Sequence, residues 1–202
     1  MSSTDVLIPG PRDVRATIDT PDGEAEATAC VVACPPHPQH RGHRGDDRLV
    51  AVSDALTSRG FDCLRFDYGD WDEGYGERED ARNAVRWAAE RYDCVGLFGF
   101  SFGGAMALLA AATVDRDVAG LSVLAPASRL GDDLDAAAAL DGLNCPVQVI
   151  YGTRDDTADP EPVVKRARER GDEVVELSAD HFFIGKHDRI GERVGEFFEA
   201  AA

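Results

Sequence analysis

The sequence predicts one α/β domain, built on a mainly parallel, doubly wound sheet that begins with an antiparallel hairpin. Short, almost continuously apolar runs alternate with amphipathic segments, as they do where helices cover both faces of a parallel sheet. The length of 202 residues suits one domain. Hydrophobic residues make up 44% and charged residues 29%, the balance of a protein with a buried core. We therefore expect residues 1–202 to form a single domain.

The individual elements follow from the pattern in chain order. Val14–Thr20 and Glu24–Ala29 flank the turn sequence Pro21-Asp22-Gly23, which predicts the antiparallel hairpin. Later apolar runs have the length and composition of buried strands: Cys30–Cys34, Cys63–Phe66, Cys94–Phe100, Gly120–Ala125, Val147–Tyr151 and Glu173–Leu177. The segments between and after them are expected to be helices: Asp47–Arg59, Gly76–Arg91, Phe102–Val114, Glu161–Arg170 and His187–Ala201.

The charge of the chain disfavours some classes of partner. With 21 basic and 38 acidic residues the net charge is −17, so we expect no nucleic-acid partner and no anionic membrane. Aspartates (25) outnumber glutamates (13), and there are 2 lysines against 19 arginines. Such a composition is typical of proteins in concentrated salt, where screening weakens the repulsion between carboxylates. We expect an acidic halophilic protein; an ordinary acidic protein from a GC-rich genome is the alternative.

The sequence also indicates the compartment. Its apolar runs are shorter than the roughly 18–20 residues that a membrane-spanning helix needs. Residues 1–13 have neither the basic nor the apolar region of a secretory signal, so we expect a cytoplasmic protein. The five cysteines lie in or beside apolar runs without C-x-x-C spacing, which favours buried free thiols over disulfides or metal ligation.

A serine between an expected strand and an expected helix indicates the chemistry. Gly99-Phe100-Ser101-Phe102-Gly103 matches the pattern G-x-S-x-G in the strand–turn–helix context that gives the motif its meaning. In that context the turn strains the backbone of Ser101 and projects its hydroxyl, while the first amides of the helix point at the same place. Gly99 and Gly103 omit Cβ atoms that would collide with neighbouring backbone. We therefore expect Ser101 to be a nucleophile.

A serine nucleophile needs a base, and the base needs a carboxylate to orient it. His181 and His187 are the histidines in the last part of the chain, and His181 lies in the loop after the last expected strand. From there its imidazole can reach the carboxyl edge of the sheet, whereas His187 begins the terminal helix. Asp155 and Asp156 follow Val147–Tyr151 at that same edge. Asp155 is the expected acid, and Asp156 is the alternative.

The order Ser101, Asp155, His181 is the order found in α/β-hydrolases. The chain resembles a small α/β-hydrolase of the dienelactone-hydrolase-like group over about residues 30–200. The motifs that carry the resemblance are Cys-Pro-Pro-His-Pro-Gln-His-Arg-Gly at 34–42, similar to H-P-H-P-x-x-G-G, then Arg65–Tyr68 followed by Gly76–Asp80, and finally Asp180–Phe183. The resemblance implies an α/β-hydrolase fold and serine hydrolase activity on ester bonds.

The sequence departs from that group at two places. Pro35 stands where the group has its first histidine, and the glycine-rich turn after the Arg-Phe strand is shortened to Gly69–Gly74. Dienelactone hydrolases have a cysteine at the position of Ser101, so their lactone specificity is not carried over to this chain.

Acyl transfer also needs two amide donors for the developing oxyanion. The N–H of Phe102, the residue after the nucleophile, is expected to supply one, and the loop after Cys30–Cys34 the other. Prolines at positions 35, 36 and 38 have no N–H, which leaves His37 and Gln39 as donors before His40. His37 aligns better with the position that the group uses.

The same loop allows a second interpretation. Its histidines, together with two following aspartates, are residue types that bind transition metals: His37, His40, His43, Asp46 and Asp47. The neighbouring arginines oppose a bound cation, and we expect the histidines to line the mouth of the pocket instead. We expect neither a metal nor another cofactor.

The residues around the motif limit the substrate. The connection from Pro126 to Cys145 is too short for the lid domain of many lipases, so we expect no lid domain. Candidate pocket residues are aromatic: Tyr68, Trp71, Phe100 and Phe182. An apolar mouth favours a small-molecule acyl substrate, an ester or a thioester. A small serine peptidase and a non-catalytic binding protein of the same fold are the alternatives.

Overall fold

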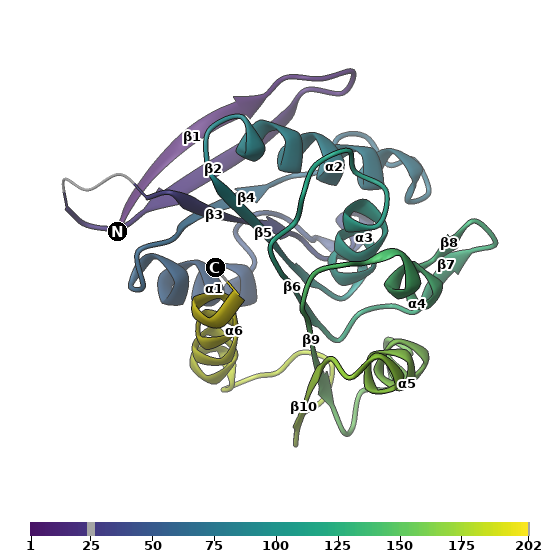
Figure 1. Cartoon of the computed structure of the whole chain (residues 1–202). Coiled ribbons are helices and arrows are strands. Elements are labelled where there is room, and N and C mark those ends of the chain that lie inside the picture. Colours follow the sequence, from purple (N-terminus) through teal and green to yellow (C-terminus); the bar gives the residue numbers. More distant parts are fainter. Residues whose placement is uncertain (24–26, 202) are drawn as a thin grey trace.

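The computed structural model describes residues 1–23 and 27–201 and shows a sheet covered by helices on both faces (Figure 1). Within these residues the central sheet has 8 strands in the order β1-β2-β4-β3-β5-β6-β9-β10. The first two strands pair antiparallel, and β2 also pairs antiparallel with β4. From β4 to β10 all neighbours are parallel. The predicted fold class, an α/β-hydrolase sheet with an antiparallel start, is confirmed.

The strands of this sheet are β1 (Ser2–Ile8), β2 (Val14–Thr20), β3 (Ala29–Cys34), β4 (Asp62–Phe66), β5 (Cys94–Phe100), β6 (Leu121–Leu124), β9 (Val147–Gly152) and β10 (Glu173–Leu177). The helices are α1 (Asp47–Thr57), α2 (Tyr75–Ala89), α3 (Phe102–Ala111), α4 (Ala136–Ala139), α5 (Glu161–Arg170) and α6 (His187–Ala201). Short elements complete the fold: the 3₁₀ turns η1 (Pro38–His40) and η2 (Leu140–Gly142), and the hairpin strands β7 (Arg129–Gly131) and β8 (Leu134–Asp135). The connection expected to lack a lid domain holds β7, β8, α4 and η2.

The antiparallel hairpin uses a different segment from the one predicted. Val14–Thr20 is a strand, but it pairs with Ser2–Ile8 through the turn at residues 9–13. Of the predicted partner Glu24–Ala29, residues 24–26 lie outside the described residues, and residue 29 already belongs to β3. The prediction was wrong because Pro21-Asp22-Gly23 is a strong turn sequence, whereas β1 is a polar, largely exposed edge strand without clear alternation.

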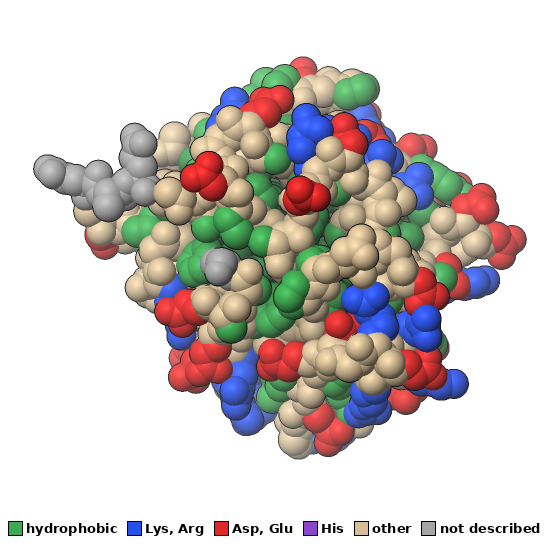
Figure 2. All heavy atoms as spheres, in the orientation of Figure 1, with side chains coloured by type: hydrophobic (Ala, Val, Ile, Leu, Met, Phe, Trp, Pro, Cys, Tyr) green, Lys and Arg blue, Asp and Glu red, His purple; other side chains and the backbone are tan. Residues whose placement is uncertain are grey.

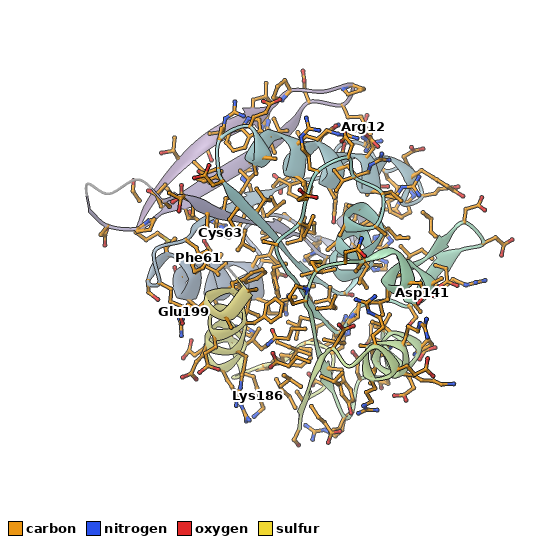
Figure 3. The ribbon with its side chains drawn as sticks, viewed as in Figure 1. Arg12, Phe61, Cys63, Asp141, Lys186 and Glu199 are labelled. Atoms are coloured by element: carbon orange, nitrogen blue, oxygen red, sulfur yellow. The ribbon has the colours of Figure 1, made fainter. Side chains whose placement is uncertain are left out.

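The helices divide the core into two layers, one on each face of the sheet. α1 and α6 cover one face, and α2, α3 and α5 cover the other (Figure 1). Phe61 and Cys63 belong to the layer under α1 and α6, as Figure 3 shows. Because both faces are covered, the central strands are apolar almost throughout, which explains why their limits are readable in the sequence.

A buried ion pair ties the hairpin to the parallel part of the sheet. Arg65 on β4 donates through Nε to Asp19 on β2 at 2.6 Å, and Ser53 of α1 donates to the same carboxylate at 2.6 Å. Burial alone would raise the pKa of Asp19, but hydrogen bonds from Arg65, Ser3 and Ser53 outweigh it and leave this pKa below its ordinary value. Arg65 also donates through Nη1 to the carbonyl of Arg44 at 2.6 Å. The pair thereby anchors the loop that follows β3.

The five cysteines are free thiols, as predicted. Cys30, Cys34 and Cys63 are buried, and burial raises the pKa of Cys63 to about 12. These three side chains therefore act as small apolar groups in the core. Cys94 and Cys145 are half-buried.

The surface carries charges of both signs. Figure 2 shows acidic and basic side chains interspersed around the edge of one face, with hydrophobic side chains nearer its centre. Arginines pair with neighbouring carboxylates, as Arg86 does with Asp115 at 2.8 Å. Among the described residues, no helix has the length and apolar character needed to cross a membrane.

Candidate active site

Ser101 occupies a strained turn between β5 and α3. Its backbone has φ 58° and ψ −118°, a positive φ that a residue with a side chain adopts only at a cost. The Ser101 N–H donates to the carbonyl of Leu124 at 2.8 Å, which holds the turn against β6. The side chain is half-buried at the carboxyl edge of the sheet. It also lies where the amides of the first turn of α3 have no acceptor within the helix.

The glycines on either side of Ser101 are required by close backbone contacts. A Cβ at Gly99 would lie 2.2 Å from the carbonyl oxygen of Gly103, and one at Gly103 would lie 2.2 Å from that of Cys34. Both distances are far below van der Waals contact. The expected reason for the glycines in G-x-S-x-G is therefore confirmed, and the contact with Cys34 also brings the loop after β3 to the start of α3.

The structure brings Ser101, His181 and Asp155 into one hydrogen-bonded chain. Ser101 Oγ lies 3.0 Å from His181 Nε2, and His181 Nδ1 lies 2.8 Å from Asp155 Oδ2. The side chains of His181 and Asp155 are 6% and 1% exposed, so their contact is shielded from water. This is the geometry in which a carboxylate orients an imidazole and the imidazole accepts a proton from a hydroxyl.

Asp155 is held in place through its other oxygen. Oδ1 accepts the backbone N–H groups of Thr157 and Ala158, each at 3.0 Å, so both carboxylate oxygens are engaged. Asp156 is exposed, and the hydrogen-bond partner of His181 Nδ1 is Asp155. Of the two carboxylates left open by the sequence, the structure therefore places Asp155 against the imidazole.

Aromatic rings and a local turn fix His181. The imidazole lies 5.2 Å from the ring of Phe100, and the ring of Phe182 meets it edge-on at 5.6 Å. The N–H of Phe182 donates to Asp180 Oδ1 at 3.0 Å, which closes a turn around the histidine. His187 begins α6, as expected, and takes no part in the chain of hydrogen bonds to Ser101.

The two expected oxyanion donors belong to neighbouring residues. Phe102 is the first residue of α3, and the ring of His37 lies 4.8 Å from its ring. His37 Nδ1 accepts the N–H of Gln39 at 3.2 Å, and the His37 carbonyl accepts the N–H of Gly42 at 3.0 Å. Burial, together with the nearby charge of His40, lowers the pKa of His37. The His37 imidazole thus accepts a hydrogen bond within its own loop.

The aromatic residues expected in the pocket lie at different depths. Trp71 and Phe182 are 36% and 52% exposed, and their rings lie beside those of His37 and His181, respectively. Phe100 is 2% exposed, and Tyr68 packs edge-on against Phe102 with a ring-centroid separation of 5.7 Å. Trp71 and Phe182 are therefore accessible to a ligand, whereas Phe100 packs against His181 and Tyr68 packs against Phe102. Burial raises the pKa of Tyr68 well above its usual range.

Buried charges hold the loop that carries Trp71. Glu77 is fully buried and accepts the N–H groups of Asp72 and Gly74 at 2.9 and 2.8 Å. Asp80 accepts the N–H of Gly69 at 2.9 Å and pairs with Nε of Arg12 at 3.0 Å. The sequence showed Glu77 and Asp80 as parts of a family-like motif, but it did not indicate Arg12, whose partner lies far along the chain.

Two of the three loop histidines pack with each other. The rings of His37 and His40 stack with centroids 4.6 Å apart, and His43 Nδ1 accepts the N–H of Gly45 at 3.0 Å. Over residues 1–23 and 27–201, no three histidine, cysteine or acidic side chains are grouped as ligands of one metal ion would be.

Comparison with known proteins assigns the family. A family model described as X-Pro dipeptidyl-peptidase (S15 family) matches residues 20–191, most of the chain. The chain belongs to the S15 family. No curated protein sequence matches this S15 family member.

Solved structures have the same fold as this S15 family member. An α/β serine hydrolase homologue from Coxiella burnetii is similar with 28% identity, a TM-score of 0.82 and 98% of each chain covered. A serine hydrolase without a lid from Xanthomonas campestris is 24% identical with a TM-score of 0.82, covering 98% of this chain and 94% of that one. A dienelactone hydrolase from Anabaena variabilis is 21% identical with a TM-score of 0.78, covering 99% and 98%. The predicted resemblance to small α/β-hydrolases, a dienelactone hydrolase among them, is confirmed.

Proposed function

We propose that this chain hydrolyses a small ester, thioester or related acyl substrate through a covalent acyl-enzyme formed on Ser101. The observation that carries the proposal is the unbroken chain from Ser101 Oγ to His181 Nε2 at 3.0 Å and from His181 Nδ1 to Asp155 Oδ2 at 2.8 Å. A serine hydroxyl is a weak nucleophile by itself, and such a chain activates it.

The proposed reaction has two halves. Ser101 Oγ attacks the carbonyl carbon while His181 Nε2 takes its proton, and the carboxylate of Asp155 stabilises the imidazolium that forms. The N–H groups of Phe102 and His37 bind the oxyanion. The tetrahedral adduct then expels the alcohol or thiol, which leaves with the proton from His181. Water, deprotonated by the same imidazole, attacks the acyl-enzyme and releases the acid and free Ser101.

The surroundings of the site favour an apolar, uncharged acyl group. Trp71 and Phe182 offer exposed aromatic surface next to His37 and His181, respectively. The net charge of −17 disfavours substrates with several negative charges, because the mean field of the protein repels them. Peptide hydrolysis is the second candidate, because the matching family model is described by a dipeptidyl-peptidase activity.

Labelling with a fluorophosphonate tests the nucleophile. Wild-type protein should take up one label, and Ser101→Ala should remove it together with hydrolysis. Ser58→Ala, the same change at an exposed serine after α1, is the matched control and should behave as wild type. Label that survives Ser101→Ala contradicts the proposal, and an unlabelled wild type favours the non-catalytic binding protein. A panel of acyl esters, acyl thioesters and X-Pro anilides then separates the esterase from the peptidase.

A further inference from the structure

One arginine contacts the sequence neighbours of both Ser101 and His181. Arg48 lies in the first turn of α1, and its side chain is 16% exposed. Its guanidinium carbon lies 4.4 Å from the centroid of the Phe100 ring. Its Nη1 donates to the carbonyl of Phe182 at 3.2 Å. Phe100 directly precedes Ser101 and Phe182 directly follows His181, so one cation joins the two segments that carry the pair.

The guanidinium is held by a carboxylate on its own helix. Asp46 caps the N-terminus of α1 by accepting the N–H of Arg48 at 3.0 Å. The same oxygen, Oδ1, accepts from Arg48 Nε at 2.8 Å, and Nη2 pairs with Oδ2. The Asp46 side chain is 10% exposed. Because Nε and Nη2 of the planar guanidinium are both bound to the Asp46 carboxylate, the direction in which the third nitrogen, Nη1, points is also fixed.

The loop after His181 needs such a restraint. Phe183 has φ 52°, in the left-handed region that a bulky side chain disfavours. A residue keeps such a conformation only where surrounding contacts hold it. The bond from Arg48 to the Phe182 carbonyl lies one residue before this strained position. Phe100, under the guanidinium, is in turn the ring nearest the imidazole face at 5.2 Å.

We propose that Arg48 is a positioning residue that fixes His181 relative to Ser101. It acts through Phe182 and Phe100, without contact to the substrate. This inference rests on the proposed function, in which His181 accepts the proton of Ser101. When the guanidinium is lost, the loop around His181 and the Phe100 ring both gain freedom, so fewer molecules hold Ser101 Oγ within reach of Nε2. Displacement of reacting groups by 1 Å can lower a rate about 10²-fold.

The experiment compares Arg48→Met, Asp46→Asn and Arg59→Met with wild type. Asn caps helices as well as Asp does, so Asp46→Asn removes the ion pair and keeps the cap. Arg59 follows α1 and pairs with Glu199 of α6 at 3.1 Å; Glu199 is labelled in Figure 3. Its side chain is 22% exposed, which makes Arg59→Met a matched loss of an arginine outside the site.

Each variant is titrated to completion with the fluorophosphonate, so that kcat is expressed per reactive serine. Arg48→Met should lower kcat by about 10- to 100-fold with KM changed by less than about two-fold, and Asp46→Asn should have a smaller effect of the same kind. Arg59→Met should leave both parameters unchanged. A rise in KM with unchanged kcat would assign Arg48 to substrate binding and overturn the proposal. A lower titratable fraction or melting temperature with unchanged kcat per serine would show a merely structural role and overturn it too.

A measurement without substrate separates this inference from the proposed function. The imidazole proton resonances of His181, assigned with a His181→Gln variant, should shift or broaden in Arg48→Met and stay unchanged in Arg59→Met. If the wild type takes no label, the proposed function fails, while a shift confined to Arg48→Met still shows that Arg48 positions His181. Resonances that are the same in all variants would overturn the positioning role.

Discussion

Replacing Asp155 by Asn is expected to leave the fold intact and to reverse the hydrogen bond to His181. Asp155 Oδ1 accepts two backbone N–H groups, from Thr157 and Ala158 at 3.0 Å. The amide oxygen of Asn must take that position, because its NH₂ group cannot accept those bonds. The NH₂ group is thereby forced to the position of Oδ2, where it faces His181 Nδ1 at 2.8 Å.

The size of the effect follows from the tautomer. A donor at this position stabilises the imidazole with an unprotonated Nδ1 and a proton on Nε2. Nε2, 3.0 Å from Ser101 Oγ, is then a donor and cannot accept the serine proton. Loss of the working tautomer in a Ser-His-Asp triad lowers kcat about 10⁴-fold, equivalent to about 5.5 kcal/mol of transition-state stabilisation.

The assay is kcat on a p-nitrophenyl ester, with thermal unfolding as the check on the fold. Asp156→Asn is the matched control: the same change one residue along, on an exposed side chain that should leave kcat near wild type. If Asp155→Asn keeps kcat within about ten-fold of wild type, the role assigned to the carboxylate is wrong. A loss confined to Asp156→Asn would move that role to the neighbouring residue.

Two further predictions concern metal and salt. Dialysis against a strong chelator should leave ester turnover unchanged, because the serine chain accounts for the chemistry; activity lost and then restored by Zn²⁺ would assign a role to His37, His40 and His43. The melting temperature should rise steeply from dilute buffer to molar KCl. The net charge of −17 lies within a fold of roughly 16–17 Å radius, so its carboxylates repel one another in dilute buffer. At 1 M salt the Debye length falls to about 3 Å, which screens this repulsion. A flat or falling melting temperature would refute the halophilic interpretation.

The parallel part of the fold could be predicted because its pattern is local. Cys94–Phe100, Glu173–Leu177 and Glu161–Arg170 have the predicted limits. In Cys94–Phe100 an almost fully buried apolar run ends where polar residues begin, whereas in Glu161–Arg170 the buried side chains have the spacing of one helix face. The hairpin partner could not be predicted in this way. Ser2–Ile8 pairs with Val14–Thr20 at the edge of the sheet, where exposed polar residues are compatible with either strand or loop.

The site could be predicted where its residues belong to short motifs. Ser101 and its flanking glycines are recognisable because a Cβ at Gly99 or Gly103 would meet backbone at 2.2 Å, a constraint that applies in any such turn. The sequence favoured Asp155 as the carboxylate that orients the histidine, but it could not exclude Asp156. The turn that buries the carboxylate of Asp155 and exposes that of Asp156 depends on hydrogen bonds to later residues. No motif indicates the role of Arg48, since its contacts join segments that are distant in the chain.

Three arginines outside the proposed reaction share one arrangement at the loops that border the site. In each, Nε binds a carboxylate: Arg12 to Asp80 at 3.0 Å, Arg48 to Asp46 at 2.8 Å and Arg65 to Asp19 at 2.6 Å. A terminal nitrogen of each arginine also donates to a main-chain carbonyl in a loop. Arg12 donates to the carbonyl of Asp70, next to Trp71, and Arg48 donates to that of Phe182, next to His181. Arg65 donates to the carbonyl of Arg44, which directly follows the last loop histidine.

This arrangement requires the guanidinium. Its planar fork presents donors in fixed directions, so a carboxylate that holds Nε also sets where the terminal nitrogens point. The compact ammonium of lysine can bind the same carboxylate, but it then carries no rigid second donor toward the loop carbonyl. At positions 12, 48 and 65, arginine is therefore needed because it binds a carboxylate and a loop carbonyl at the same time. This requirement is independent of whatever sets the ratio of 19 arginines to 2 lysines in the chain as a whole. In each pair, a carboxylate within or at the end of a regular element orients an arginine that holds a loop of the site.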